Sequence, residues 1–193
     1  MKNNLTEKDI EVLNKWAEKY YIEELKIKDK EKIFNLKGLY IGGRGDLTEL
    51  PKEIGILTNL KILIIRCNNL KELPKEIFNL INLEELHISS DNLTELPKEI
   101  GNLTNLKSLD IDCYLNELPK EIYNLINLEK LSIRINNLEI SPDGIEKLIN
   151  LENLYIDINI INENFNFKSL PIEEMGKLNN LKEFDIRIRK EEK

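Results

Sequence analysis

Apolar residues recur along this chain at a fixed spacing. A leucine is followed two positions later by an isoleucine in seven successive units, with phenylalanine replacing leucine in the last. The leucine position holds Leu39, Leu63, Leu86, Leu109, Leu131, Leu154 and Phe184. The isoleucine position holds Ile41, Ile65, Ile88, Ile111, Ile133, Ile156 and Ile186. Because alternate residues of a strand point to the same face, the spacing predicts seven short strands, each with one buried face.

A second repeated pattern lies between these strands. The string Leu-Pro-Lys-Glu-Ile occurs four times, and two degenerate copies follow. Its prolines are Pro51, Pro74, Pro97, Pro119, Pro142 and Pro171, at steps of 23, 23, 22, 23 and 29 residues. Proline suits the first turn of a short helix. We therefore expect a short helical turn after each strand, and a stack of repeats that builds one shared core.

The complete unit, L-x-x-L-x-I-x-x-N-x-L-x-x-L-P-x-x-I-x-x-L-x-N, resembles the 23-residue leucine-rich repeat of the Scribble-type and plant intracellular Ras-group class. That class also has bacterial members, and the resemblance covers roughly residues 22–190. It implies an α/β solenoid with a curved parallel β-sheet on the concave side and short helical or 3-10 turns on the convex side. It also implies a binding scaffold, but no chemistry, because such proteins share a shape and differ in ligand.

The first 34 residues differ from the repeats, and we assign 1–34 to an N-terminal cap and 35–193 to the repeat domain, as one cooperative unit. Thr6 and Asp9 resemble a capping box, with Asp in place of the usual Glu or Gln. One helical face then carries Ile10, Leu13, Trp16, Ala17 and Tyr20. We expect a helix that covers the first edge of the sheet, then a degenerate strand at Ile22, Leu25 and Ile27. The alternative is that Trp16 and Tyr20 belong to a docking helix.

The segment that begins at each Leu-Pro motif is expected on the convex side and is called the outer arc. Successive outer arcs alternate between small and bulky residues. One position holds Gly55, Phe78, Gly101 and Tyr123 in turn, so the period is nearly two repeats. We expect Phe78 and Tyr123 to lean over the neighbouring glycines, and Gly101→Phe to crowd the arc.

Regularity breaks once, between Ile161 and Leu170, where most of the seven extra residues of the repeat from Leu151 to Leu181 lie. Insertions in repeat proteins form loops, often on the binding side. Phe165 and Phe167 in this insertion are candidate exposed anchors, because aromatic residues dominate binding hot spots. The alternative is that they fill a wider arc.

The C-terminal end is charged, with Arg187, Arg189 and 190–193 on and after the last strand. Charged edges resist pairing with other sheets, so we expect a monomer.

Composition narrows the classes of function. The 193 residues are 41% hydrophobic and 33% charged, which excludes a wholly disordered chain. The net charge of −7 argues against a nucleic-acid binder. We expect no secretory signal and no membrane span, because no long apolar run occurs. With only two cysteines, the cytoplasm is the expected location, and export by a route without such a signal stays open.

Candidate chemistry is sparse. His87 is the only histidine, so a multi-histidine metal site is excluded. Cys67 should lie on the order of 10 Å from His87, too far for a catalytic pair, and Cys113 too far from Cys67 for a disulfide. Gly42-Gly43-Arg44-Gly45 lacks the following helix of a phosphate loop and is interpreted as a turn. We predict no enzyme, cofactor or metal, and interpret Asp110 and Asp112 as acids on an open, wet face.

The sheet face that points away from the core is the predicted binding surface. Its candidates are Tyr40, Ile62, Ile64, Arg66, Glu85, His87, Asp110, Asp112, Lys130, Arg134, Tyr155 and Asp157. The early end is apolar and the centre acidic, which predicts a protein or peptide partner with an apolar anchor and basic groups. The alternatives are an unused surface, the recognition arm of a larger enzyme or effector, and a structural or adhesive role.

Overall fold

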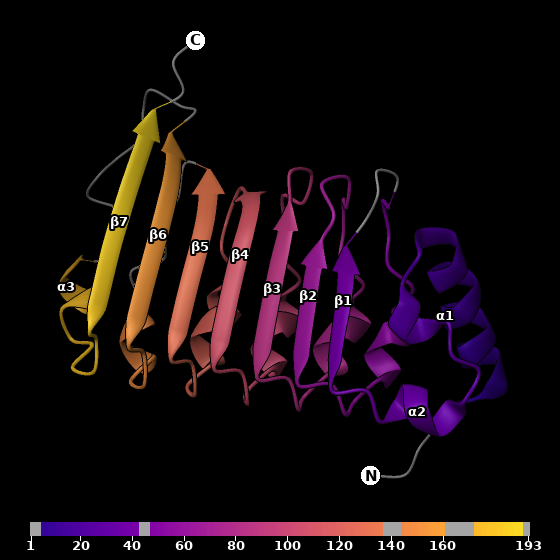
Figure 1. Cartoon of the computed structure of the whole chain (residues 1–193). Helices are drawn as coiled ribbons and strands as arrows, with labels where there is room; N and C mark the ends of the chain where they lie inside the picture. The colour runs from indigo at the N-terminus through magenta and orange to yellow at the C-terminus, as the bar shows by residue number, and fades with distance from the viewer. Residues whose placement is uncertain (1–4, 43–46, 137–143, 161–171, 191–193) are drawn as a thin grey trace.

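The computed structural model describes residues 5–42, 47–136, 144–160 and 172–190, which form one parallel sheet of seven strands in chain order (Figure 1). The strands are β1 (Gly38–Gly42), β2 (Ile62–Arg66), β3 (Glu85–Ser90), β4 (Ser108–Leu115), β5 (Lys130–Asn136), β6 (Asn153–Ile160) and β7 (Glu183–Lys190). The seven predicted strands are confirmed.

The repeat leucines lie level across the sheet. Leu63 pairs with Leu39 on one side and with Leu86 on the other, and the same register runs on to Leu154 and Phe184. The shorter fourth coil is accommodated by a register shift between β4 and β5, after Asp112. The repeat spacing therefore fixes the register as predicted.

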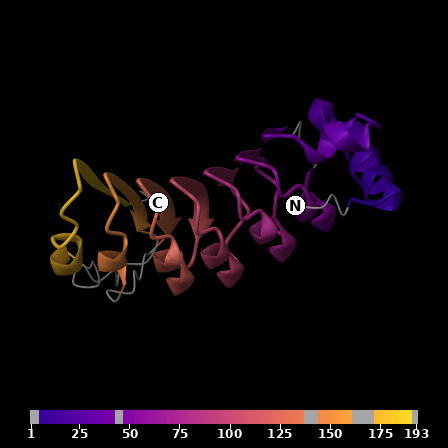
Figure 2. The same cartoon turned by 90° about the horizontal axis from the view of Figure 1, so that it is seen from below.

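Short turns line the opposite side of each coil. The 3-10 turns are η2 (Lys52–Ile56), η3 (Lys75–Asn79), η4 (Lys98–Asn102), η5 (Lys120–Asn124) and η6 (Ile145–Lys147), and the last coil has the helix α3 (Ile172–Met175). A proline precedes each of η2 to η5, as expected. Figure 2 shows the strands on the inner side and the turns on the outer side of a shallow arc. The predicted solenoid is confirmed.

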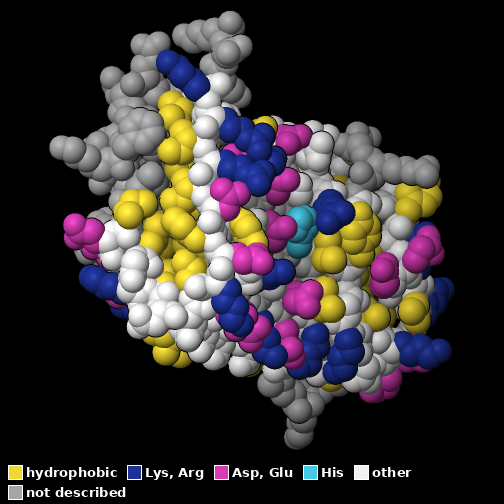
Figure 3. Space-filling view, turned by 60° about the vertical axis from the view of Figure 1, so that its left-hand side comes forward, with side chains coloured by type: hydrophobic (Ala, Val, Ile, Leu, Met, Phe, Trp, Pro, Cys, Tyr) yellow, Lys and Arg dark blue, Asp and Glu magenta, His cyan; other side chains and the backbone are white. Residues whose placement is uncertain are grey.

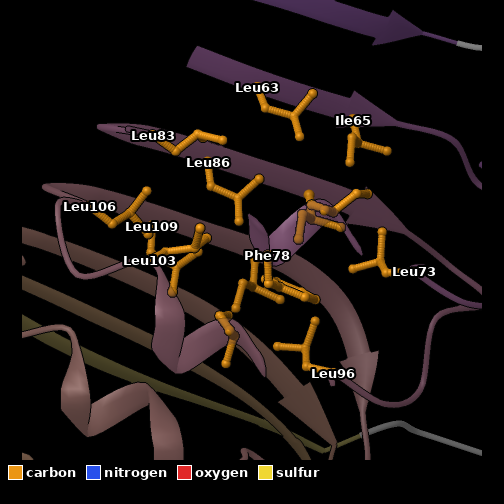
Figure 4. Packing of buried hydrophobic residues seen from close by; sticks show 14 of the residues in the cluster. Leu63, Ile65, Leu73, Phe78, Leu83, Leu86, Leu96, Leu103, Leu106 and Leu109 are labelled. Carbon is orange, nitrogen blue, oxygen red and sulfur yellow. The ribbon is translucent and has the colours of Figure 1, made fainter. Parts of the chain in front are cut away.

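A single apolar core runs along the stack between strands and turns. Phe78 is fully buried and lies among leucines of neighbouring coils, including Leu96 and Leu103 (Figure 4). No coil could bury these side chains alone, so each coil depends on the next.

A ladder of asparagines ties the coils together. The asparagine that lies three residues before the start of each strand from β2 to β7 donates a side-chain N–H to a backbone carbonyl of the preceding coil, at 2.7–3.0 Å. Its members are Asn59, Asn82, Asn105, Asn127, Asn150 and Asn180. These side chains satisfy carbonyls that the turns leave without a backbone partner.

The glycines of the two-repeat alternation lie against the backbone of the next outer arc. A Cβ at Gly55 would lie 2.1 Å from the Glu76 carbonyl oxygen, and one at Gly101 2.8 Å from that of Glu121. The glycines thus let the backbone of the next arc approach, and η2 packs closely on η3 and η4 on η5. The packing of Phe78 over a glycine stays a prediction.

Tyr123 does lie against a glycine, but a different one. A Cβ at Gly144 would lie 2.4 Å from its ring, and Gly144 has φ 126°, which favours glycine. Tyr123 therefore packs towards the following coil, and not over Gly101.

The N-terminal segment contains α1 (Glu7–Tyr20), η1 (Glu23–Leu25) and α2 (Lys30–Phe34). The capping box between Thr6 and Asp9 is present. Leu13 and Ala17 are fully buried, and Trp16 packs half-buried on the same core, so the amphipathic helix is confirmed.

The expected degenerate strand at Ile22, Leu25 and Ile27 is wrong, because η1 occupies this segment. The Asn14 side chain of α1 donates hydrogen bonds to the carbonyls of Leu25 and Ile27, the latter at 3.1 Å. A helix side chain therefore holds carbonyl groups that a strand would have paired with a neighbour.

Two other expectations fall on residues that the structure does not describe. Gly43, Arg44 and Gly45 of the glycine-rich turn lie outside the described residues. So do Phe165 and Phe167 of the insertion.

Candidate functional site

The concave face consists of the strand residues that alternate with the buried leucines and isoleucines. One row crosses five strands at the same level, from Ile64 through His87, Asp110 and Ser132 to Tyr155. Residues two positions earlier and later form parallel rows. Because the register is level, side chains from neighbouring strands meet directly, about 4.8 Å apart.

The face is apolar at its N-terminal end. Tyr40 is 47% exposed and Ile62 37% exposed, while Ile64 is half-buried between them and β3. The Tyr40 ring lies over Gly42, where it leaves no room for a side chain. Large apolar side chains with no place in the core are typical of contact surfaces.

A chain of polar contacts crosses the next three strands. Arg66 Nε donates to His87 Nε2 at 3.2 Å, and His87 Nδ1 lies 2.7 Å from Asp110 Oδ2. Since Nε2 accepts from Arg66, the imidazole proton sits on Nδ1 and is donated to Asp110. The neighbouring Cys67 is buried, and its thiol donates to the Ile41 carbonyl at 3.5 Å.

Ion pairs continue across β4 to β7. Arg134 Nη1 lies 2.6 Å from Asp112 Oδ1, and its Nε lies 3.8 Å from Asp157 Oδ2. Arg189 Nη2 lies 2.8 Å from the same Asp157 oxygen. Asp157 is the most enclosed of these groups, with its side chain 19% exposed.

Glu183, which was not predicted as a site residue, is the first residue of β7 and lies on the concave face. It accepts hydrogen bonds from the Tyr155 hydroxyl and from Asn153 Nδ2, the latter at 2.7 Å. The bond from Tyr155 lowers the pKa of Glu183, and the same bond raises the pKa of Tyr155. The Tyr155 ring is thereby held in one orientation beside the charged row.

A pocket of about 230 Å³ opens among these groups, between β4 and β7. Its polar lining consists of Asp110, Asp112, Ser132, Arg134, Tyr155, Asp157, Asp185 and Arg187. Four carboxylates therefore face two guanidinium groups, so the pocket carries a net negative charge. Figure 3 shows the face around the single histidine, with charged side chains of both signs beside it.

The structure separates the predicted binding residues into those that line the pocket and those that do not. It brings Asp110, Asp112, Arg134, Tyr155 and Asp157 together around the pocket. Tyr40 and Ile62 lie apart at the apolar end, while Glu85 and Lys130 are exposed at the start of their strands and line no part of the pocket.

The centre of the face differs from the simple acidic patch that composition suggested. Asp110 faces His87, and Asp112 faces Arg134. These partners come from adjacent strands, 22 or 23 positions away in the sequence. A partner with basic groups must therefore compete with bases that the face already contains.

The described residues offer little for catalysis. They contain no group of three or more histidine, cysteine, aspartate or glutamate side chains that would hold a metal ion. Burial raises the pKa of the Cys113 thiol to about 12, so it stays protonated and a poor nucleophile. Among the residues that the structure describes, every helix is too short or too polar to cross a membrane.

Comparison with known proteins gives a family and several structural neighbours. The family model described as "Leucine-rich repeat region" matches residues 86–193, more than half of the chain. No curated protein matches. An internalin from Listeria monocytogenes is similar with a TM-score of 0.60 and 20% identity, over 83% of this chain and 46% of that one.

Internalin C2 from the same organism has a TM-score of 0.62 and 25% identity, over 82% of this chain and 66% of that one. The Arabidopsis receptor kinase HAESA, solved with a peptide hormone and a co-receptor, has a TM-score of 0.54 and 22% identity. That match covers 72% of this chain and 24% of the kinase chain. The chain therefore spans about half to two thirds of the internalins that it matches.

Proposed function

The chain belongs to the leucine-rich repeat family, and from this premise we propose that it is a non-enzymatic scaffold that binds a protein or peptide on its concave face. The observation that carries the proposal is the pocket between β4 and β7, which lies on the same face as exposed Tyr40 and Ile62. A hollow with charged walls and, further along the same face, an apolar patch together have the composition of a recognition surface.

Two features support an extended peptide segment as the ligand. The concave face is formed by a single sheet, with one side chain from each strand at each level. Its apolar and charged parts follow each other along the stack. The similar receptor kinase was solved with a peptide hormone, which shows that a solenoid of this fold accommodates a peptide in that protein. We extend that mode of binding to this chain as a proposal.

The ligand should carry an apolar side chain and, further along, a basic group. Ile62 and Tyr40 would cover the first. The net negative pocket would hold the second, since Asp110 and Asp112 remain 42% and 40% exposed although each has a basic neighbour. Charge-assisted hydrogen bonds of this kind give orientation and specificity.

Narrower assignments belong to the same proposal. We propose the 23-residue Scribble-type and plant intracellular Ras-group class on the repeat steps of 22 and 23 residues, and a bacterial source because that class has bacterial members. We propose a cytoplasmic location, because the sequence contains only two cysteines and a disulfide-built secreted domain would need more.

Selection from a displayed peptide library tests the function. Peptides selected on the whole protein should combine hydrophobic and Lys or Arg residues, and their affinity is then measured on two variants. Ile62→Asp and Asp112→Lys should each weaken binding at least about tenfold, because each removes one of the two contacts.

Matched controls separate the concave face from general surface effects. Ile126→Asp changes an isoleucine that is 50% exposed on the outer arc, and Glu117→Lys reverses an exposed charge of the same coil outside β4. Both should leave affinity unchanged. Equal affinity of all four variants, or loss on the outer arc alone, would overturn the proposal.

A further inference from the structure

The C-terminal end of the core has no coil to cover it among the described residues. Phe184 and Ile188 of β7 are 48% and 40% exposed, whereas the equivalent Leu154 and Ile158 of β6 are fully buried. Figure 3 shows apolar side chains gathered at this end of the molecule. The last strand thus presents a row of core residues to the outside.

The backbone of β7 is also open on that side. Glu183 donates its N–H to the Glu152 carbonyl of the preceding coil, so Glu183 and every second residue after it bond towards β6. The N–H and C=O groups of Phe184, Ile186 and Ile188 then point away from the sheet. An edge of this kind is ready to pair with another strand.

The charges along β7 have an order that selects one partner. Reading from its start, the face outside the core carries Glu183 and Asp185, then Arg187 and Arg189. If a second copy of the strand ran antiparallel with Ile186 opposite Ile186, each acid would face a base. Glu183 would lie opposite Arg189, and Asp185 opposite Arg187.

We propose that β7 pairs antiparallel with β7 of a second copy of this chain, centred on Ile186. The resulting two-fold contact is self-complementary, as a symmetric dimer requires. Phe184 lies opposite Ile188 of the second copy, on the core side, so both apolar ends are covered. The residues whose backbone groups point outward face each other, and each such pair exchanges two hydrogen bonds.

Neighbouring registers are unfavourable. Sliding the second strand by two residues in either direction keeps the outward backbone groups paired. In one direction it places Asp185 opposite Asp185, and in the other Arg187 opposite Arg187. Like charges directly opposite each other destabilise a sheet. At the ends of the favoured register Lys190 lies opposite Lys182, where Glu152 already neutralises Lys182 at 2.8 Å.

The existing contact between Asp185 and Arg187, the two charges nearest the centre, permits the exchange. Asp185 pairs with Arg187 of its own strand at 2.9 Å, and these side chains are 40% and 67% exposed. Exposed pairs of this kind contribute little to stability, so they can be replaced across the interface. The charges that led us to expect a monomer therefore make the edge complementary to itself.

The dimer would also border the candidate binding site. Asp185 and Arg187 line the pocket, so the second copy's strand would form a wall beside it. The two concave faces would join into one continuous sheet.

Complementary charge variants test the pairing. The mass of the full chain is measured by light scattering after size exclusion, at micromolar to millimolar concentration. The unchanged protein should have twice the mass of one chain. Asp185→Arg and Arg187→Asp should each be monomeric, because each creates like-charged pairs, while a mixture of the two should restore the dimer.

The mixture excludes an effect within one chain, because each variant keeps its own disrupted strand. Circular dichroism of each variant confirms that it is folded. A monomeric unchanged protein, or a mixture that stays monomeric, overturns the proposal.

Crosslinking tests the register. Ile186→Cys should form a disulfide between copies under oxidation, since residues opposite each other lie about 5.5 Å apart at Cα. Phe184→Cys, which faces Ile188 of the second copy, should not crosslink. The reverse result would overturn the proposed register. None of these readouts depends on a bound peptide, so they are independent of the proposed function.

Discussion

At the N-terminal end α1 covers the first coil, whereas at the C-terminal end β7 leaves its apolar row open. Leu13 of α1 is fully buried in the shared core, and Asn14 holds two carbonyls of the segment that follows. Phe184 is 48% exposed although it occupies the same repeat position as the buried Leu39 of β1. The difference shows that the repeat motif makes a strand, but its neighbour decides whether that strand is buried.

The largest effect is expected at the covered end. Leu13→Asp places a charge where no partner lies, and should cost about 4 kcal/mol or more of unfolding free energy. We expect the cap and the repeats to unfold together, in one urea transition followed by circular dichroism.

Glu11→Gln on the exposed side of the same helix is the control and should change stability by less than about 0.5 kcal/mol. Two separate transitions in Leu13→Asp, with the repeats intact in the second, would contradict the single cooperative unit of residues 1–193.

A direct comparison of the buried and the open strand comes next. Leu154→Ala in β6 should cost about 3 kcal/mol, because it leaves a cavity in a fully buried site. Phe184→Ala in β7 should cost less than about 1.5 kcal/mol, since half of that side chain is already exposed. Both changes are made in the Asp185→Arg background, where the chain should be monomeric. Equal losses would show that the open end is covered in solution.

The outer arcs should show a smaller contrast. Gly55→Ala forces a Cβ against the Glu76 carbonyl, and overpacking of this kind costs about 2 kcal/mol. At Gly176 of the last coil an added Cβ would lie 3.3 Å from the nearest atom, a much looser contact than at Gly55, so Gly176→Ala should cost less than Gly55→Ala. Thermal unfolding compares the two, and the idea that glycine lets the arcs pack in pairs fails if Gly55→Ala melts like the unchanged protein.

Much of this fold follows from residue spacing. The Leu-x-Ile pairs and the proline steps predicted the strands, their level register and the outer turns, because every repeat buries the same apolar positions against its neighbours. The first coil escaped the prediction. Ile22, Leu25 and Ile27 have strand spacing, but Asn14 on the preceding helix is the hydrogen-bond donor to the carbonyls of Leu25 and Ile27.

The candidate site was harder to predict than the fold. Register alone places His87 beside Asp110, yet the hydrogen bond between them depends on side-chain torsions that no spacing reveals. Glu183 was missed because its role rests on Tyr155 and Asn153 of the previous strand. A search for opposite polar residues in the predicted register would have found this group.

Photo-crosslinking from the concave face tests the central claim most directly. A photoreactive residue is placed at Ser132 in the pocket and, as control, at the exposed Lys98 of the outer arc. Each protein is irradiated with a selected peptide at a concentration near its Kd. Binding on the concave face predicts a crosslink from Ser132 that Asp112→Lys abolishes, and none from Lys98. A crosslink from Lys98 alone, or one from Ser132 that survives Asp112→Lys unchanged, would contradict it.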